Sequence, residues 1–228
     1  MAKRGDSSAF VYHWIKSNRS SHATTEEKYE DAFGTLILIL NDLILKSGRS
    51  LGHRFGHSCI CFTETPVWFM SDDKSKYQPF GFEFYKNFIY KIGGQHVIYC
   101  SEESSRRLPS EDLWKWVRHE PLVRTQQAPY GIDFSWEREI RVNRSELEFM
   151  GANEFVDGSS PGNVNFAFTR IYVPSPEWKE KLLKELSVML NTWLNDNYNK
   201  VDDYEYEWLK EFYADMLSEY DFIIECIS

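Results

Sequence analysis

The ten residues 133–142 constrain the fold most strongly, because apolar and polar side chains alternate along them. A period of two residues predicts a β-strand that presents Glu137 and Glu139 on one face, with Arg141 beside them. Adjacent carboxylates repel each other. A fold therefore retains such a pair where water solvates it, where arginine neutralises it, or where it stabilises a positively charged reacting centre. Arg138 and Arg141 favour a solvated, ion-paired face, and these residues alone leave both interpretations open.

Short apolar runs separated by turn residues predict an α+β fold. Thr24 and Glu27 have the spacing of a capping box, at the start of a helix that extends toward Gly48. Pro176 begins a second long helix, and an acidic helix follows at residues 204–218. We expect a bent, split β-sheet core of six or seven short strands, with flanking helices and a C-terminal helical pair. The predicted strands are residues 10–15, 59–63, 80–84, 96–100, 133–142, 166–173 and 221–227.

The segments between these elements include a short helix and a loop. Ser110 caps a predicted helix that Pro121 ends. Residues 151–163 contain three glycines, a proline and two serines, which predicts a loop that could serve as a lid.

The sequence carries no sign of a membrane or secreted protein. No apolar run approaches the roughly 20 residues that span a bilayer, and the basic N-terminal residues are not followed by the apolar stretch of a signal peptide. Four cysteines are too few for a disulfide scaffold in a chain of 228 residues. We therefore expect a cytoplasmic protein with reduced thiols and no contact with a membrane.

One cluster contains residue types that bind metals: His53, His57, Cys59 and Cys61. The two histidines have a helical spacing, whereas the two cysteines lie in a predicted strand, and no second ligand pair is close in the sequence. Small core side chains explain the cysteines better, so we expect no metal site.

The negative charge is concentrated at the C-terminus. Residues 176–228 contain 13 acidic residues and five lysines, a net charge of −8, whereas residues 1–175 contain 22 acidic and 21 basic residues. The near-neutral body does not exclude contact with nucleic acid, because only the C-terminal quarter would repel phosphate.

The order of three widely separated motifs is informative. Tyr12 and His13 lie in the first predicted strand, Thr63 ends the second, and Glu137 and Glu139 lie in a late strand. This order resembles the ADP-ribosyltransferase superfamily, whose split site has a His or Arg, then a Ser or Thr, then a Glu. DarT-type toxins of that superfamily begin with a similar Tyr-His strand. The Glu-x-Glu pair resembles that of arginine-specific members, which carry Arg where this chain has His13.

A second resemblance covers residues 10–142. Five segments are similar, in the same order, to the AbiGi-type family of abortive phage-infection proteins: residues 11–14, 61–66, 80–86, 94–99 and 134–139. That family is associated with phage defence, as an antitoxin-like partner of a nucleotidyltransferase-like toxin. The two resemblances together imply an ADP-ribosyltransferase-like domain at residues 1–175. The acidic helices of residues 176–228 lie outside the resemblance, and we expect them to pack on the same domain.

The transferase resemblance implies a role for each motif residue, with NAD as the substrate. Glu139 would orient the ribose and stabilise the positive charge that develops as nicotinamide leaves, and Glu137 would position or deprotonate the acceptor. His13 would bind the adenosine-side ribose, and Thr63 would brace Glu139 or the nicotinamide. Tyr85 or Phe80 would stack on the nicotinamide ring. Nucleic acid is one candidate acceptor.

A non-catalytic alternative is an antitoxin or binding module that neutralises a toxin partner through its acidic C-terminal surface. The acids would also be explained by a helix whose polar face is simply solvated, and the sequence leaves these alternatives open. The acidic stripe consists of Asp202, Asp203, Glu205, Glu207, Glu211, Asp215 and Glu219.

Overall fold

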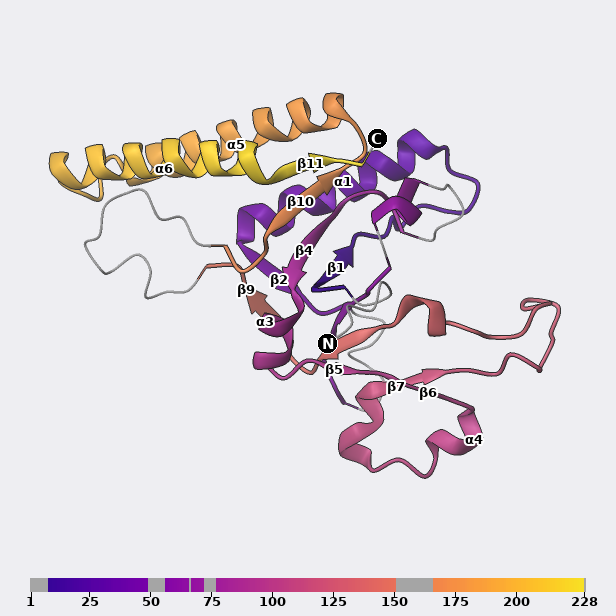
Figure 1. Cartoon of the computed structure of the whole chain (residues 1–228). Coiled ribbons are helices and arrows are strands. Elements are labelled where there is room, and N and C mark those ends of the chain that lie inside the picture. The colour runs from indigo at the N-terminus through magenta and orange to yellow at the C-terminus, as the bar shows by residue number, and fades with distance from the viewer. Residues whose placement is uncertain (1–7, 49–55, 66, 72–76, 151–165, 228) are drawn as a thin grey trace, which may run out of the picture. The chain divides into compact units, whose positions relative to one another are not determined.

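The computed structural model describes residues 8–48, 56–65, 67–71, 77–150 and 166–227, and it confirms the α+β class (Figure 1). The chain divides into two compact units that alternate along the sequence. Unit 1 comprises Met1–His13, Leu45–Pro66 and Phe84–Leu147, whereas unit 2 comprises Trp14–Ile44, Val67–Glu83 and Glu148–Ser228. The described residues form eleven short strands rather than the six or seven that we expected, because residues 96–100 divide between two strands and three strands lie outside the predicted runs: β2 (Ile44–Lys46), β7 (Trp116–Arg118) and β9 (Glu146–Glu148).

Unit 1 is built around a three-stranded antiparallel sheet, in which β8 (Ile140–Val142) lies between β3 (Ile60–Phe62) and β5 (Gln95–His96). Paired residues share a face of a sheet, and successive residues alternate between faces. The register therefore defines two faces. The Phe62 face carries Phe62, Ile140 and His96, and the Cys61 face carries Cys61, Arg141 and Gln95.

The strand β1 (Phe10–Trp14) extends this sheet through one bridge. Tyr12 and Thr63 exchange two backbone hydrogen bonds of 2.8 Å. Tyr12 therefore shares the Cys61 face with Thr63, and the next residue, His13, lies on the Phe62 face. The rings of His13 and Phe62 meet edge to face, with their centroids 6.1 Å apart.

The other elements of unit 1 are short. The helix α3 (Lys86–Lys91) begins directly after β4 (Gly81–Tyr85), and β6 (Ile98–Cys100) pairs in parallel with β7 (Trp116–Arg118). The helix α4 (Glu102–Ser105) and the 3-10 helix η2 (Ser110–Lys115) connect those two strands. A further pair consists of β2 (Ile44–Lys46) and β9 (Glu146–Glu148).

Unit 2 combines a sheet with three helices. The strand β10 (Arg170–Val173) pairs antiparallel with β4 and parallel with β11 (Ile224–Cys226). The helix α1 (Thr25–Asp42) has the expected capping box of Thr24 and Glu27, but it ends at Leu43 in a left-handed conformation rather than at Gly48. A 3-10 helix, η1, covers Val67–Ser71. An aromatic cluster joins α1 to the sheet and to α5: Tyr29, Phe33, Phe80 and Trp178.

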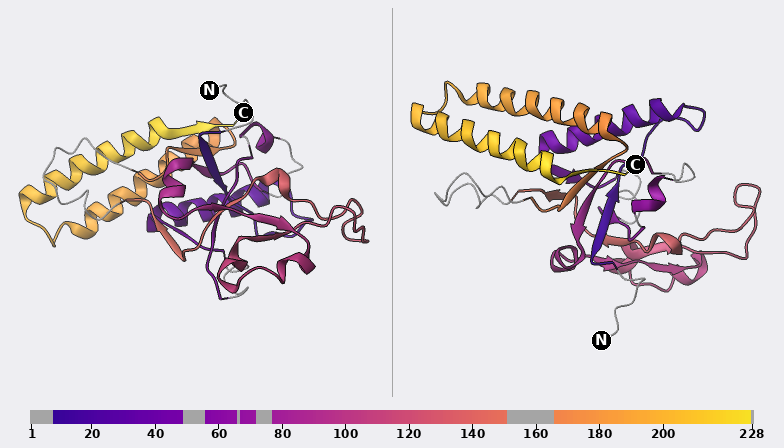
Figure 2. Two further views of the ribbon diagram at one scale, coloured as in Figure 1. Left: turned by 60° about the horizontal axis from the view of Figure 1, so that its bottom comes forward. Right: turned by 45° about the horizontal axis from the view of Figure 1, so that its top comes forward.

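The C-terminal helical pair of the sequence prediction is present. The helices α5 (Pro176–Asn197) and α6 (Asp203–Ile223) form an antiparallel hairpin, and α1 packs beside α5 (Figure 2). Asp202 and Glu205 form a second capping box at the start of α6. The predicted edge strand at the C-terminus is also present as β11. None of the helices in the described residues is long and apolar enough to cross a membrane.

The prediction of one strand over residues 133–142 is wrong. Only Ile140–Val142 are extended, and Ser135–Glu137 form the 3-10 helix η3. The carboxylate of Asp133 accepts hydrogen bonds from the backbone N–H of Ser135 (2.9 Å) and from its hydroxyl (2.6 Å). Such local side-chain bonds compete with strand pairing, and here they override the alternating pattern.

Two other predicted elements differ from the structure. Residues 96–100 divide between β5 and β6, which belong to different sheets, and at the junction Val97 donates its N–H to Glu139 O (3.1 Å). The predicted helix at residues 110–120 is a short 3-10 helix followed by β7. The predicted lid at residues 151–163 lies outside the described residues.

Candidate functional site

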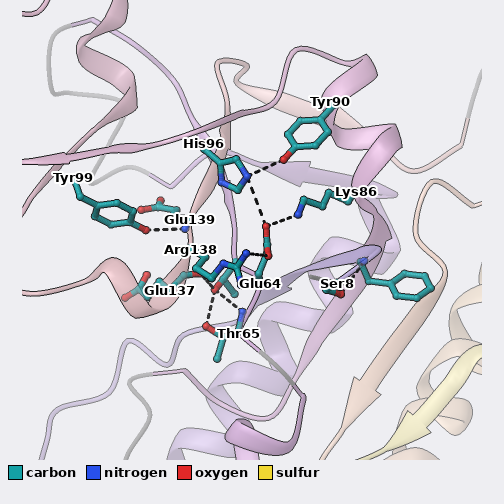
Figure 3. A network of polar contacts seen from close by, with 12 residues as sticks. Ser8, Glu64, Thr65, Lys86, Tyr90, His96, Tyr99, Glu137, Arg138 and Glu139 are labelled. Atoms are coloured by element: carbon teal, nitrogen blue, oxygen red, sulfur yellow. Dashed lines mark hydrogen bonds and ion pairs between the residues drawn. The ribbon is translucent and has the colours of Figure 1, made fainter. Parts of the chain in front are cut away.

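A buried carboxylate with several cationic neighbours is the most unusual polar feature of unit 1 (Figure 3). Glu64 follows β3 and has a side chain that is 1% exposed. Its Oε1 lies 2.6 Å from Lys86 Nζ and 3.7 Å from His96 Nε2, and its Oε2 lies 3.1 Å from Arg138 Nη2. We call these four residues the Glu64 cluster.

Backbone geometry brings the η3 turn to Glu64. Glu64 donates its N–H to Glu137 O (3.2 Å), and the hydroxyl of Thr63 donates to the same carbonyl. Arg138 follows with a φ of +46°, a left-handed conformation that costs a residue with a side chain roughly 1–2 kcal/mol. The η3 turn and the left-handed backbone of Arg138 together direct the guanidinium of this residue toward Glu64.

The other two cations come from α3 and β5. Lys86 is the first residue of α3, and its backbone N–H donates to Ala9 O (2.9 Å), which fixes the start of that helix beside β1. His96 lies on the Phe62 face, and its Nε2 is also 2.8 Å from the hydroxyl of Tyr90 on α3. The cluster therefore depends on four separate segments of unit 1.

The charges of the Glu64 cluster do not balance. One carboxylate faces two permanent cations, Lys86 and Arg138, together with an imidazole. Burying Glu64 carries a desolvation penalty that its cationic neighbours offset. The side chains of Arg138 and His96 remain 46% and 50% exposed, so they also face solvent. Such an arrangement can bind an anion, because it combines surplus positive charge with accessible N–H donors.

A second polar group lies on the Cys61 face. Arg141 binds both carboxylate oxygens of Glu139, at 2.9 and 3.1 Å, and donates to Trp114 O (2.7 Å) and Trp116 O (3.0 Å). Glu139 and Arg141 are both buried. Although burial lowers the pKa of Arg141, the Glu139 carboxylate more than compensates and raises it above its ordinary value.

The Glu139–Arg141 ion pair perturbs its neighbours. Burial, followed by the Glu139 charge, raises the pKa of the Cys61 thiol well above its usual range. Burial also raises the pKa of Tyr99 to about 12, and the nearby carboxylates of Glu139 and Glu137 contribute in the same direction. The Tyr99 hydroxyl accepts a hydrogen bond from Glu139 N (2.8 Å). The Cys61 thiol and the Tyr99 phenol are therefore held in their neutral forms.

The structure brings together some of the residues that the sequence predicted, but not all. Thr63 contacts the backbone of Glu137, and Glu137 is itself buried within η3. His13 is held on the Phe62 face, where its Nδ1 lies 2.8 Å from Cys61 O, whereas the Glu139 carboxylate lies on the Cys61 face with Arg141. Tyr85 is 55% exposed, and its ring lies 5.2 Å from that of Phe10. The catalytic and binding roles of these residues stay predictions.

Sequence reasoning missed the four members of the Glu64 cluster as site residues. Glu64 follows the apolar strand β3 and is flanked by two threonines, and Lys86 follows the aromatic strand β4. A charged residue at the end of an apolar strand is a weak signal, because strand ends commonly reach solvent. Nothing in the sequence indicated that these ends converge.

The structure gives no candidate metal centre in the residues that it describes: no group of three or more His, Cys, Asp or Glu side chains is placed to hold an ion there. Cys59, Cys61, Cys100 and Cys226 are free thiols.

No protein-family model, curated protein or solved structure matches this chain. The family resemblances of its motifs therefore remain proposals.

Proposed function

We propose that this protein acts in phage defence and that its unit 1 binds NAD, with the Glu64 cluster as the phosphate-binding part of the site. The observation that carries the proposal is the charge surplus at Glu64, where Lys86, Arg138 and His96 surround one carboxylate. Arginine and lysine are the side chains that proteins most often use to bind phosphate oxygens. In the resting site, Glu64 holds both cations in place, and the side chain of Arg138 is 46% exposed.

Aromatic side chains beside the cluster favour a nucleotide over a simple anion. Tyr85 precedes Lys86 and is 55% exposed, and Tyr90 lies one helical turn after Lys86 and is 39% exposed. Exposed rings next to a phosphate-binding site can stack on a base or on nicotinamide. A dinucleotide with two phosphates and two aromatic rings matches this combination of groups.

The proposed reaction is transfer of ADP-ribose. The C–N bond between nicotinamide and the ribose breaks, nicotinamide leaves as a neutral base, and an acceptor nucleophile forms the new bond at the same carbon and loses a proton. A carboxylate stabilises the positive charge that develops on the ribose. Glu139 and Glu137 remain the candidates for this role. Arg141 binds both oxygens of Glu139 on the Cys61 face, whereas His96 of the Glu64 cluster lies on the Phe62 face. Glu137, whose backbone carbonyl contacts Glu64 N, is therefore the stronger candidate.

The test is the effect of NAD on the thermal unfolding of the full chain. NAD at about 100-fold excess over Kd should add about 2.7 kcal/mol to the free energy of unfolding. Lys86→Met should abolish that gain. Lys115→Met is the matched control, because Lys115 is a similarly buried lysine paired with Asp112, with 17% of its side chain exposed against 16% for Lys86.

Two results would contradict the proposal: wild-type protein whose unfolding does not respond to NAD, or a response that survives in Lys86→Met. Release of nicotinamide, followed by chromatography, then decides whether the bound NAD is consumed.

A second candidate function has its own supporting observation. Unit 2 would act as a binding module for a toxin partner, because the acidic side chains of α6 are solvent-exposed. Asp203, Glu205, Glu207, Glu211 and Asp215 are exposed, and Glu219 is partly exposed. Two aromatic side chains near the hairpin turn, Tyr198 and Tyr204, are 62% and 83% exposed. Exposed aromatic residues among charges are typical of protein interfaces.

This second function is tested with four Glu→Gln changes, at residues 205, 207, 211 and 219. The changes should leave the chain folded and any NAD binding intact, since a glutamine side chain at position 205 can still form the capping box with Asp202. They should slow association with a co-purified partner and flatten its salt dependence. Unchanged association at low and high salt would leave the acids with no role beyond solvation.

A further inference from the structure

The α5–α6 hairpin carries a shallow groove. It has a volume of about 390 Å³ and is lined by Leu183 of α5 and by four residues of α6: Ala214, Leu217, Ser218 and Asp221. Leu183 and Leu217 are half-buried, whereas the other three side chains are exposed. The floor is therefore apolar and accessible.

Acidic residues continue the groove along α6. Glu207, Glu211, Ala214, Ser218 and Asp221 follow one another at spacings of four, three, four and three, so they form one stripe on the helix surface. All five are exposed. The two small residues leave room at the centre of the stripe, and acids stand at both ends. This stripe covers about four helical turns, or roughly 21 Å.

Two lysines contact these acids. Lys210 Nζ lies 3.1 Å from Glu207, and Lys179 Nζ lies 2.9 Å from Asp221. Both carboxylates are 63% exposed, and exposed pairs contribute only about 0–1 kcal/mol. A cationic partner can therefore replace Lys210 at little cost, whereas Lys179 also donates to Asp221 O and Ile224 O and stays in place. The surrounding segment has a net charge of −8.

We infer that this groove docks an amphipathic basic helix of a partner protein. Apolar side chains on one face of that helix would enter the groove between Leu183 and Leu217, while its lysines or arginines would pair with Glu207, Glu211 and Asp221. Charge complementarity selects this occupant, since an acidic or neutral helix would gain only the small apolar contact. The inference rests on the second candidate function and deepens it by naming the site and the chemistry of the partner.

The experiment measures binding of a fluorescent helical peptide of about 18 leucines and lysines, with the leucines on one face, to the full chain. A scrambled peptide of the same composition has the same charge but no apolar face, and it is the control for simple electrostatic attraction. Ala214→Glu is the decisive variant, because it adds an acid and also fills the groove. Asn191→Glu is its matched control, since it adds an acid at an exposed position of α5 that does not line the groove.

If the amphipathic helix docks in the groove, the amphipathic peptide should bind at least about tenfold more tightly than the scrambled one. It also predicts that Ala214→Glu weakens binding about tenfold, while Asn191→Glu leaves it within about twofold. Circular dichroism should give the same helix content and melting temperature for both variants.

Three results would overturn the inference. Equal binding of both peptides, or tighter binding to Ala214→Glu, would mean that charge alone attracts the peptide, so that the acidic-surface function stands without the groove. If neither peptide binds, the result contradicts both the docking role of the groove and the second candidate function. A wild-type dimer that Ala214→Glu converts to monomer would make the groove a contact between copies of this chain.

Discussion

Both units of this protein contain a deeply buried glutamate, and the two carboxylates are held in different ways. In unit 2, Glu83 accepts hydrogen bonds from the hydroxyls of Thr169 (2.7 Å) and Tyr172 (2.9 Å), and Arg170 Nε lies 3.5 Å away. In unit 1, the oxygens of Glu64 are held by ion pairs, and within the described residues they accept no hydrogen bond of normal geometry.

The difference teaches how to distinguish a structural carboxylate from a functional one. The partners of Glu83 lie on or beside the adjacent strand β10, and Arg170 also pairs with Glu225 of β11, so this network joins three strands. The partners of Glu64 are two cations and an imidazole, and the side chains of Arg138 and His96 are 46% and 50% exposed. A network of hydroxyl donors stabilises the fold, whereas a network of ion pairs with exposed cations is suited to an added anion.

The largest expected effect is on stability. Glu83→Ala should lower the free energy of unfolding by about 3 kcal/mol, because it removes the carboxylate that accepts hydrogen bonds from the hydroxyls of Tyr172 and Thr169 and that faces Arg170. Glu64→Ala should cost only about 1 kcal/mol, since the variant also removes the penalty of burying a carboxylate, and two of its three partners, Arg138 and His96, are 46% and 50% exposed. Urea unfolding of both variants measures the difference. An equal decrease in the free energy of unfolding in the two variants would mean that both carboxylates are structural.

The next largest loss of stability is expected when the Glu139–Arg141 ion pair on the Cys61 face is broken. Glu139→Gln should lower the free energy of unfolding by about 2 kcal/mol, because it leaves Arg141 buried with its charge uncompensated. The same variant should abolish NAD consumption if Glu139 stabilises the ribose. Assays at a temperature where the variant is folded separate the two effects. Full turnover in the folded variant would show that Glu139 is not the catalytic carboxylate. Glu137 would then be the remaining candidate.

A smaller effect concerns the charge of the Glu64 cluster. Glu64→Gln keeps the shape of the side chain and removes the anion that competes for Lys86 and Arg138. The affinity for inorganic pyrophosphate should therefore rise, by about threefold to tenfold. Glu83→Gln is the matched control and should leave that affinity unchanged. Weaker pyrophosphate binding in Glu64→Gln would contradict this prediction. It would mean that the carboxylate mainly holds the cations in place and does not compete with the ligand.

A further effect is expected at alkaline pH. The pKa of Tyr99 in the folded chain is about 12, above its ordinary value of 10. The neutral phenol is thus favoured by folding, and its contribution is complete below pH 10 and is lost as pH rises through about 12. Melting temperatures of wild type and Tyr99→Phe should therefore converge between these values. A constant difference over this range would show that Tyr99 does not titrate with folding.

Local patterns in the sequence predicted where the long helices begin. The capping box at Thr24 and the proline at position 176 give helix starts that depend on neighbouring residues only, and the structure has both. The edge strand near residue 224 was also predictable from its short apolar run. These elements follow from propensity and spacing, which do not depend on distant contacts.

The candidate site could not be predicted in the same way. The alternation at residues 133–142 predicted a strand, but the carboxylate of Asp133 and the hydroxyl of Thr63 stabilise a turn there instead. That turn gives Arg138 its left-handed conformation and brings it to Glu64. Residues 64, 86, 96 and 138 meet through strand register and tertiary contacts, and no spacing rule connects them.

The central claim is that the Glu64 cluster binds the phosphates of NAD, and calorimetric titration of Arg138→Asn with NAD tests it most directly. Asparagine tolerates the left-handed conformation, so the variant removes the guanidinium with little change in backbone strain. Arg118→Asn is the matched control, because Arg118 is an equally exposed arginine of unit 1 paired with Glu120. The account predicts that Arg138→Asn raises the Kd for NAD at least about tenfold, as expected for lost charge-assisted hydrogen bonds, while Arg118→Asn leaves it within about twofold. Equal affinities in the two variants would contradict it.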